Sequence, residues 1–332
     1  MRKGDLMTRL FRLLAAGCWL LASGSWLLAS VDGVVMNATT SQPQASVKVN
    51  LLQPGSSGMK TLATVQSDAD GKFKIDEQIP PGPAILQADY QGATYNVVLT
   101  PGTPTSGVTV NIYNATTDPA TGTAAQGMIL IEPSATTIQV GETFLFENST
   151  KLSYVNEKAG SLRFYVPKDA ANVDVTVNAP GGMPIRRPAE KTSKVGIFKI
   201  GYPIKPGETR FDINYSLPAG DTFAGKNPDT SIPIRLVTPP AVTLSGDGLQ
   251  SLGQEPKTQA HIYQVSGSDF TLKIDGAGSL RNPETANTGP DSGAPQLEVK
   301  PARIYGRLDW VLALTLGILA LGGVMLFRRG SA

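Results

Sequence analysis

The chain has 332 residues, with 29 Lys and Arg against 27 Asp and Glu, and a formal net charge of +2 at neutral pH. This balance argues against a nucleic-acid-binding protein, which normally concentrates basic residues on one face. Cys18 is the only cysteine, so an internal disulfide is excluded. His261 is the only histidine, so the chain has too few His and Cys residues for a zinc site built from several such ligands. We therefore expect packed cores to supply the stability, and we expect no cofactor.

Residues 1–30 have the layout of a secretory signal. Arg2, Lys3, Arg9 and Arg12 precede the apolar run 13–29, and small residues occupy 22–25 and 29–30. Cys18 faintly resembles a lipoprotein processing site, but the apolar run continues beyond it. We expect the chain that follows to be exported, with this segment either removed as a signal peptide or kept as an uncleaved anchor.

Residues 31–115 contain short runs in which apolar and polar residues alternate, such as 47–51, 72–75 and 108–112, separated by Gly and Pro turns. A period of two indicates half-buried strands, and the turn spacing predicts a small antiparallel sandwich. Asp70-Gly71 predicts a hairpin turn. The same stretch superficially matches a calcium loop, but Lys74 occupies a ligand position, so the turn is the simpler interpretation.

Several motifs in this segment, in their order and spacing, resemble the carboxypeptidase regulatory-like domain, a transthyretin-like β-sandwich. They are Val31-Asp32-Gly33-Val34-Val35, Ala45-Ser46-Val47-Lys48-Val49, Asp68-Ala69-Asp70-Gly71-Lys72-Phe73-Lys74-Ile75, Pro80-Pro81-Gly82 and Tyr90-Gln91-Gly92. The resemblance covers residues 31–114 and departs at Ala84 and Ala93, where such domains usually place an aromatic residue. The namesake family accompanies a zinc peptidase, but His261 is followed by Ile262-Tyr263-Gln264 without the required glutamate, so we expect no peptidase site.

The rest of the chain is divided by composition. Residues 116–126 are small and lack apolar periodicity, which predicts a linker. Alternating runs in 127–240, clearest over 211–217, predict a second, Ig-like β-sandwich. Residues 241–280 predict a small β extension, which either completes a layer of that sandwich or forms a third unit. The expected fold class is thus all-β, with tandem sandwiches between an N-terminal signal segment and a C-terminal membrane helix.

The C-terminal region predicts a tether. Residues 281–308 are rich in Gly, Pro, Asn and Thr, which is typical of a flexible stalk. The charge-free run within 309–328 has the length and hydropathy of a transmembrane helix, and Arg328 and Arg329 after it indicate that the tail 329–332 is cytoplasmic. We expect a single-pass protein of the cytoplasmic membrane, with the bulk of the chain periplasmic or at the cell surface.

Two pairs of residues are candidates for ligand contact. The three tryptophans lie in the apolar end segments, so tyrosines such as Tyr90 and Tyr95 would have to supply any aromatic platform for a sugar. Arg186 and Arg187 begin a basic stretch that continues with Lys191, Lys194, Lys199 and Lys205. This stretch could dock an acidic partner or anionic lipid headgroups. A solvated loop of mixed charge, with Glu190 interleaved, is the plainer interpretation of that stretch.

No nucleophile, base and metal set is evident in the sequence, so we expect a protein that is not an enzyme. The expected function is binding or scaffolding of a protein partner in the bacterial envelope, with membrane lipid contacted through the C-terminal helix and no nucleic acid bound. The alternative is a carbohydrate-binding module that recognises a polysaccharide, an idea that rests on fold analogy between regulatory-like and sugar-binding sandwiches.

Overall fold

The computed structural model describes residues 30–280 except 56, 57, 78 and 80. Within this part of the chain the regular elements are β-strands and one short 3₁₀ helix, η1 (Pro119–Thr121), which confirms the all-β class. The expected signal or anchor segment up to residue 29, the stalk, the membrane helix and the tail all lie outside the described residues.

No helix in the described ranges has both the length and the apolar character needed to cross a membrane.

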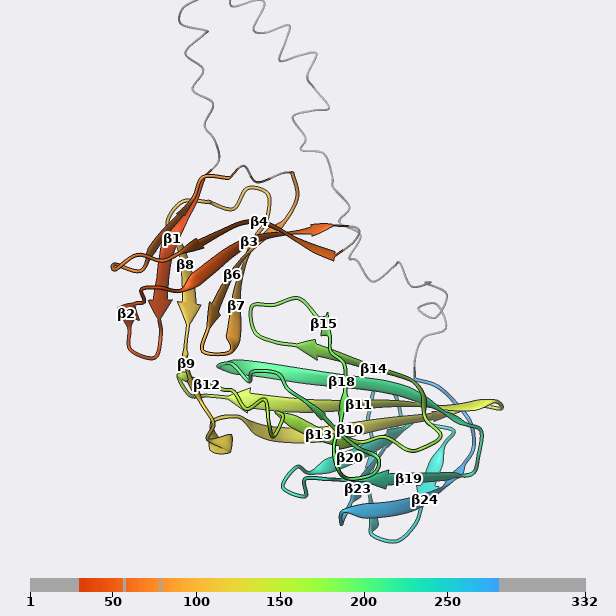
Figure 1. The fold of residues 1–332 in the computed structure, drawn as a ribbon. Coiled ribbons are helices and arrows are strands. Elements are labelled where there is room, and N and C mark those ends of the chain that lie inside the picture. The colour runs from red at the N-terminus through yellow and green to blue at the C-terminus, as the bar shows by residue number, and fades with distance from the viewer. Residues whose placement is uncertain (1–29, 56–57, 78, 80, 281–332) are drawn as a thin grey trace, which may run out of the picture. The chain divides into compact units, whose positions relative to one another are not determined.

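The first body is a β-sandwich of two four-stranded sheets (Figure 1). In one sheet β1 pairs with β2 and β5 antiparallel and with β8 parallel; the strands are β1 (Val31–Asn37), β2 (Gln42–Pro43), β5 (Lys72–Ile75) and β8 (Val108–Ile112). The other has the order β4-β3-β6-β7, from β3 (Lys48–Gly55), β4 (Gly58–Gln66), β6 (Ala84–Tyr90) and β7 (Ala93–Leu99). Apolar side chains from both sheets form one core.

Alternation in β5 is confirmed: Phe73 and Ile75 are buried and alternate with the exposed Lys72 and Lys74. The Asp-Gly pair forms a turn, in which Gly71 has φ +71° and the Asp68 carboxylate accepts from the backbone N–H of Asp70 and Lys72. The expected hairpin is not formed, because the strands on either side of this turn, β4 and β5, belong to different sheets.

The second body combines an eight-stranded sheet with two three-stranded sheets. The large sheet has the order β15-β14-β18-β11-β10-β20-β23-β22, from β10 (Thr123–Pro133), β11 (Thr137–Asn148), β14 (Ala171–Asn178), β15 (Ile185–Arg186), β18 (Gly207–Pro218), β20 (Ile234–Thr238), β22 (Leu249–Gln254) and β23 (His261–Val265). The small sheets are β13-β17-β16, from β13 (Leu162–Tyr165), β16 (Glu190–Lys191) and β17 (Ile197–Ile200), and β19-β24-β21, from β19 (Thr222–Lys226), β21 (Thr243–Ser245) and β24 (Asp269–Asp275).

All three sheets of this body contribute to one apolar core. Phe211 from the large sheet, Phe164 from β13 and Phe223 from β19 are its largest fully buried side chains. Burial of aromatic rings dominates core energetics, so these contacts hold the small sheets against the large one. A separate pair of parallel strands, β9 (Asn114–Thr116) and β12 (Leu152–Tyr154), forms a two-stranded sheet.

The structure bears on two of the expected segments. The segment expected as a linker contains the end of β9, all of η1 and the first residues of β10. One of its small residues is closely packed, because a Cβ at Gly122 would lie 2.9 Å from the Ile204 side chain. Of the two alternatives for 241–280, the structure has the completing layer: β23 pairs with β20 and β24 pairs with β19.

Candidate functional site

Tyr95, one of the two tyrosines expected as a sugar platform, is buried on β7 with 4% of its surface exposed. Its hydroxyl donates to the Tyr113 carbonyl at 3.0 Å and lies 2.9 Å from Ser153 Oγ. The Lys205 ammonium lies 5.8 Å from the centre of its ring. Burial raises the pKa of Tyr95, so the hydroxyl stays protonated as a donor. The ring therefore acts in packing and presents no open face.

Tyr90 is half-buried on β6, and its polar end is also engaged. Its hydroxyl lies 3.3 Å from both Gln44 Oε1 and Asn114 Oδ1, and it accepts from Gln91 Nε2 at 3.1 Å. Asn37 Nδ2 donates to the same two oxygens, so these side chains form one polar network. Tyr90 thus contacts Asn114, and Tyr95 contacts the Tyr113 carbonyl. Both tyrosines therefore hold the chain in place where β9 begins.

Arg186 and Arg187 are consecutive in the sequence, but their side chains have different partners. Arg186 Nε lies 3.4 Å from Asp174 Oδ1 in an exposed ion pair. The Arg187 guanidinium carbon lies 5.5 Å from the centre of the Tyr202 ring, a cation–π distance. Among the contacts of the described residues none joins either arginine to Tyr90 or Tyr95, so the four predicted residues do not form one site.

Lys205, Lys194 and Lys199 of the basic stretch also lie in different surroundings. Lys205 is 4% exposed and donates to the Thr94 carbonyl at 3.1 Å. Burial lowers the pKa of Lys205 to about 8, because the charged form loses its hydration. Lys194 and Lys199, by contrast, line a cavity on the second body.

A second cavity of this body adjoins it at Arg163, a residue that lines both; we call the smaller cavity the narrow arm and the larger one the wide arm. The narrow arm has a volume of about 340 Å³, and Lys158, Arg163, Lys194 and Lys199 supply its charged groups. The wide arm has a volume of about 810 Å³ and runs past η1, the 156–161 turn and the 228–232 loop. Ala159, Arg163 and Pro228 line both arms. We call the two arms together the Arg163 groove.

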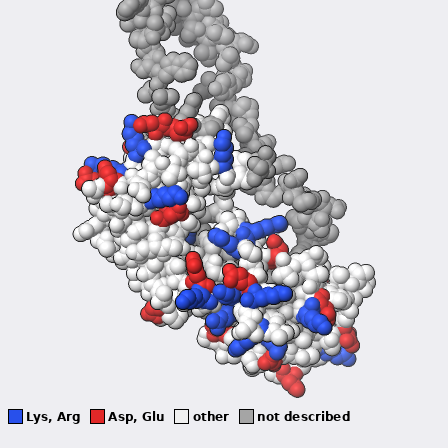
Figure 2. Space-filling model, in the orientation of Figure 1, with Lys and Arg blue, Asp and Glu red and all other residues white. Residues whose placement is uncertain are grey.

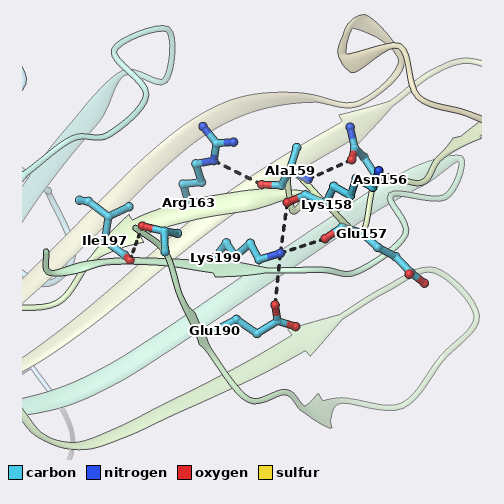
Figure 3. A network of polar contacts seen from close by, with 9 residues as sticks. Asn156, Glu157, Lys158, Ala159, Arg163, Glu190, Ile197 and Lys199 are labelled. Carbon is cyan, nitrogen blue, oxygen red and sulfur yellow. Dashed lines mark hydrogen bonds and ion pairs between the residues drawn. The ribbon is translucent and has the colours of Figure 1, made fainter. Parts of the chain in front are cut away.

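Lys199 fixes the wall of the groove (Figure 3). Its ammonium donates to the carbonyls of Glu157 at 3.0 Å and Lys158 at 3.1 Å, and lies 3.2 Å from Glu190 Oε2. These three partners match the three protons of an ammonium group. Lys199 is therefore saturated: it ties β17 to the 156–160 turn and to β16, and leaves no donor for a ligand.

The other three cations of the narrow arm are differently placed. Arg163 donates from Nε to the Ala159 carbonyl at 3.3 Å, and Figure 3 shows its two terminal nitrogens turned away from Ala159. Lys158 and Lys194 are exposed. None of the three is in an ion pair within the described part of the chain. These groups are available to an anion.

The hairpin between β16 and β17 that carries Lys194 is held firmly. Thr192 Oγ1 donates to the Ile197 carbonyl at 2.8 Å and accepts from the Lys194 N–H at 3.2 Å. Gly196 has φ +75°, and a Cβ there would lie 2.6 Å from the Tyr165 ring. Only glycine suits this position. At the tip, Val195 is 98% exposed, whereas the other exposed large apolar residues among those described reach at most 48%.

Charge on this body is otherwise mixed. In the view of Figure 2, basic and acidic side chains lie next to one another. The narrow arm is an exception, because none of the described residues that line it is Asp or Glu. In the wide arm the single lining carboxylate, Asp229, accepts from both the N–H and the hydroxyl of Ser231. The positive character of the groove is thus local.

Sequence reasoning named Lys194 and Lys199 as part of the basic stretch but missed Lys158, Arg163 and Val195. Lys158 and Arg163 lie 36 and 31 residues before Lys194 and reach the groove through the pairing of β13 with β17. A lone exposed valine has no sequence signal, since only the turn geometry places it at the tip.

In the described ranges, no three His, Cys, Asp or Glu side chains are grouped so as to hold a metal ion. His261 lies on β23 with Nε2 3.1 Å from the Pro240 carbonyl and 3.4 Å from Gln254 Nε2. Glu142 is enclosed in the core of the second body and accepts from the Tyr215 hydroxyl at 2.8 Å.

No known protein-family model matches the sequence, and no curated protein matches it. Among solved structures, the chain has a likeness to an M1 zinc metallopeptidase from Deinococcus radiodurans. A mutant bound to a Tyr-Ser-Ala substrate has 10% identity and a TM-score of 0.26, and another structure of the peptidase has 11% and 0.23. Each match covers 46% of this chain and 42% of the peptidase chain. A likeness of this size carries no conclusion about this protein.

Proposed function

We propose that this chain is a non-enzymatic protein of the bacterial cell envelope whose extracytoplasmic β-sandwich modules bind or scaffold a protein partner. The observation that carries the proposal is the Arg163 groove, two adjoining open cavities on the second body whose available charged groups are cations. The described residues that line it include no His, Cys or Glu, and Asp229 is engaged with Ser231. Such a surface suits the binding of an anionic group.

The proposal assigns the first body to the transthyretin-like, carboxypeptidase regulatory-like type and the second to an Ig-like type. Support for the first comes from the motifs in 31–114 together with two four-stranded sheets around one core. Support for the second comes from its large sheet sharing a core with two smaller ones. Sandwich folds host many functions, so the groove and not the fold is the basis of the functional argument.

The proposal places the modules outside the cytoplasm, tethered by the apolar segment within 309–328. Its support is the uninterrupted apolar composition of that segment, the Arg328-Arg329 pair after it, and the signal-like layout of residues 1–30. Tethering confines the groove to the membrane surface, where even a weak contact is favoured by a high effective concentration of a neighbouring partner.

Site-specific photo-crosslinking in intact cells tests the proposal. A photoreactive residue at Val195 of the full chain should trap one predominant envelope protein. The same residue at Val173 is the matched control: this valine is 42% exposed on β14 and neither it nor its sequence neighbours line the groove, whereas Val195 directly follows the lining residue Lys194. Equal trapping from both positions, or retention of polysaccharides instead of proteins by the purified chain, would contradict protein binding; turnover of a hydrolase substrate would contradict the non-enzymatic assignment.

A further inference from the structure

The narrow arm of the Arg163 groove concentrates positive charge that the described residues do not neutralise. Lys158, Arg163 and Lys194 line one cavity of about 340 Å³, and they come from the 156–160 turn, β13 and the β16–β17 hairpin. Among the described residues, the carboxylate that pairs with a cation of this arm is Glu190, and its partner is the saturated Lys199. Like charges held close together repel, so an anionic ligand would be stabilised here.

An exposed aliphatic group adjoins this charge. Val195 follows Lys194 at the tip of a hairpin whose conformation is fixed by Thr192 and Gly196. A single exposed apolar residue is ordinary on a protein surface. Val195 differs in being almost fully exposed on a rigid turn beside a charged cavity, so little conformational entropy is lost when a ligand covers it.

The wide arm has mostly small residues in its described lining, with Phe146 and Tyr154 beneath at 5% and 7% exposure. The Ser161 hydroxyl donates to the Tyr202 carbonyl, and the Ser231 hydroxyl donates to Asp229. This arm therefore provides room for an extended chain more than a set of free hydrogen-bond donors. Neither buried ring provides an open face on which a sugar could stack.

We infer that the Arg163 groove binds an acidic, extended peptide segment of a partner protein. Carboxylate side chains of the peptide contact Lys158, Arg163 and Lys194, with Arg163 able to engage a carboxylate through its two terminal nitrogens. An apolar residue of the peptide covers Val195, and its backbone continues into the wide arm. This inference rests on the proposed function and names the chemistry of the partner.

Fluorescence anisotropy with a defined probe tests the inference. The probe is a fluorescein-labelled Glu-Glu-Leu-Glu-Glu-Leu-Glu-Glu peptide, and its control has Gln in place of every Glu. The protein is the full chain in detergent micelles at low ionic strength, where surface charges are least screened. We expect the acidic peptide to bind below about 1 mM and the Gln peptide to bind at least about tenfold more weakly.

Two triple variants distinguish binding at the groove cations from a general effect of net positive charge. Lys158→Gln, Arg163→Gln and Lys194→Gln together should weaken binding about tenfold or more, since each exposed charge contact contributes up to a few-fold. Lys60→Gln, Lys257→Gln and Lys273→Gln remove the same charge from exposed lysines outside the groove and should change binding less than about twofold. Val195→Ser should weaken binding a few-fold without altering the fold.

The outcomes are decisive in both directions. No binding of the acidic peptide at about 1 mM, or an equal loss in the two triple variants, overturns the inference. Tighter binding of an oligogalacturonate of equal charge, lost in the groove variant, would show that the ligand is an anionic polysaccharide instead. A partner trapped at Val195 in cells that does not compete with the peptide would leave the proposed function standing while refuting this ligand chemistry.

Discussion

Glu142 makes the stability of the second body depend on pH. Its side chain lies on the same face of β11 as Val140 and Phe144 and points into the core with 5% exposure. Burial raises the pKa of Glu142 to about 7 from an ordinary value of 4.5, and the hydrogen bond from Tyr215 opposes part of that rise. Tyr215 remains a donor, because burial and the nearby carboxylate raise its own pKa.

The sign of the effect follows from proton binding. Between pH 4.5 and 7 the unfolded chain has released the Glu142 proton while the folded chain still holds it, so the folded state binds more protons. The free energy of unfolding therefore falls as the pH rises through this window and levels off above 7. A pKa change from 4.5 to about 7 corresponds to a loss of about 3 kcal/mol.

Substitution by glutamine isolates this contribution. Glu142→Gln keeps an acceptor for Tyr215 but cannot ionise, so the variant should match the wild type within about 1 kcal/mol at pH 5 and exceed its stability by about 3 kcal/mol at pH 8. Urea unfolding of the full chain in micelles, followed by far-ultraviolet circular dichroism, measures the difference. Tryptophan fluorescence is unsuitable, since Trp19, Trp26 and Trp310 lie outside both bodies.

The matched control is Glu147→Gln, which alters an exposed carboxylate on the same strand. Its stability should follow the wild type across the pH range. If the wild type and Glu142→Gln instead lose stability in parallel between pH 5 and pH 8, the buried carboxylate is not the cause and the reasoning is wrong.

Three further predictions concern groups that position the sandwiches and the groove. Because burial lowers the pKa of Lys205 to about 8 from 10.5, the unfolded state binds more protons between these values, so stability should rise with pH by up to about 3 kcal/mol; Lys205→Met should flatten that rise in urea titrations at pH 7.5 and 10. Gly196→Ala should cost about 1–3 kcal/mol in thermal unfolding because of its positive φ and the Tyr165 ring. Gly201→Ala, where the nearest atom lies at 4.0 Å, should stay within about 0.5 kcal/mol, and equal losses would contradict the steric argument. Lys199→Met leaves two carbonyls of the 156–160 turn without their donor and should cost about 1–3 kcal/mol; hydrogen exchange at the Gly160 amide should accelerate, and unchanged protection there would show that Lys199 does not hold the turn.

The all-β class follows from the sequence alone, because strand periodicity is a property of the local backbone. Alternation over 72–75 and 211–217 gives the buried and exposed faces of β5 and β18 directly. Turn chemistry was equally local: Asp68 and Gly71 form the expected turn whichever sheets it connects. The same reasoning could not assign residues 116–126, since small residues that pack closely against Ile204 have the composition of a linker.

The candidate site was decided by tertiary structure. Six cations between 186 and 205 form one basic stretch in the sequence, yet Lys205 is buried, Lys199 is saturated by two carbonyls and a carboxylate, and Arg187 lies over Tyr202. Local pattern determines which way a side chain points from its strand. Whether its charge meets an acceptor, a ring or open solvent depends on segments brought beside it from elsewhere in the chain, and for Lys194 those segments leave a cavity shared with Lys158 and Arg163.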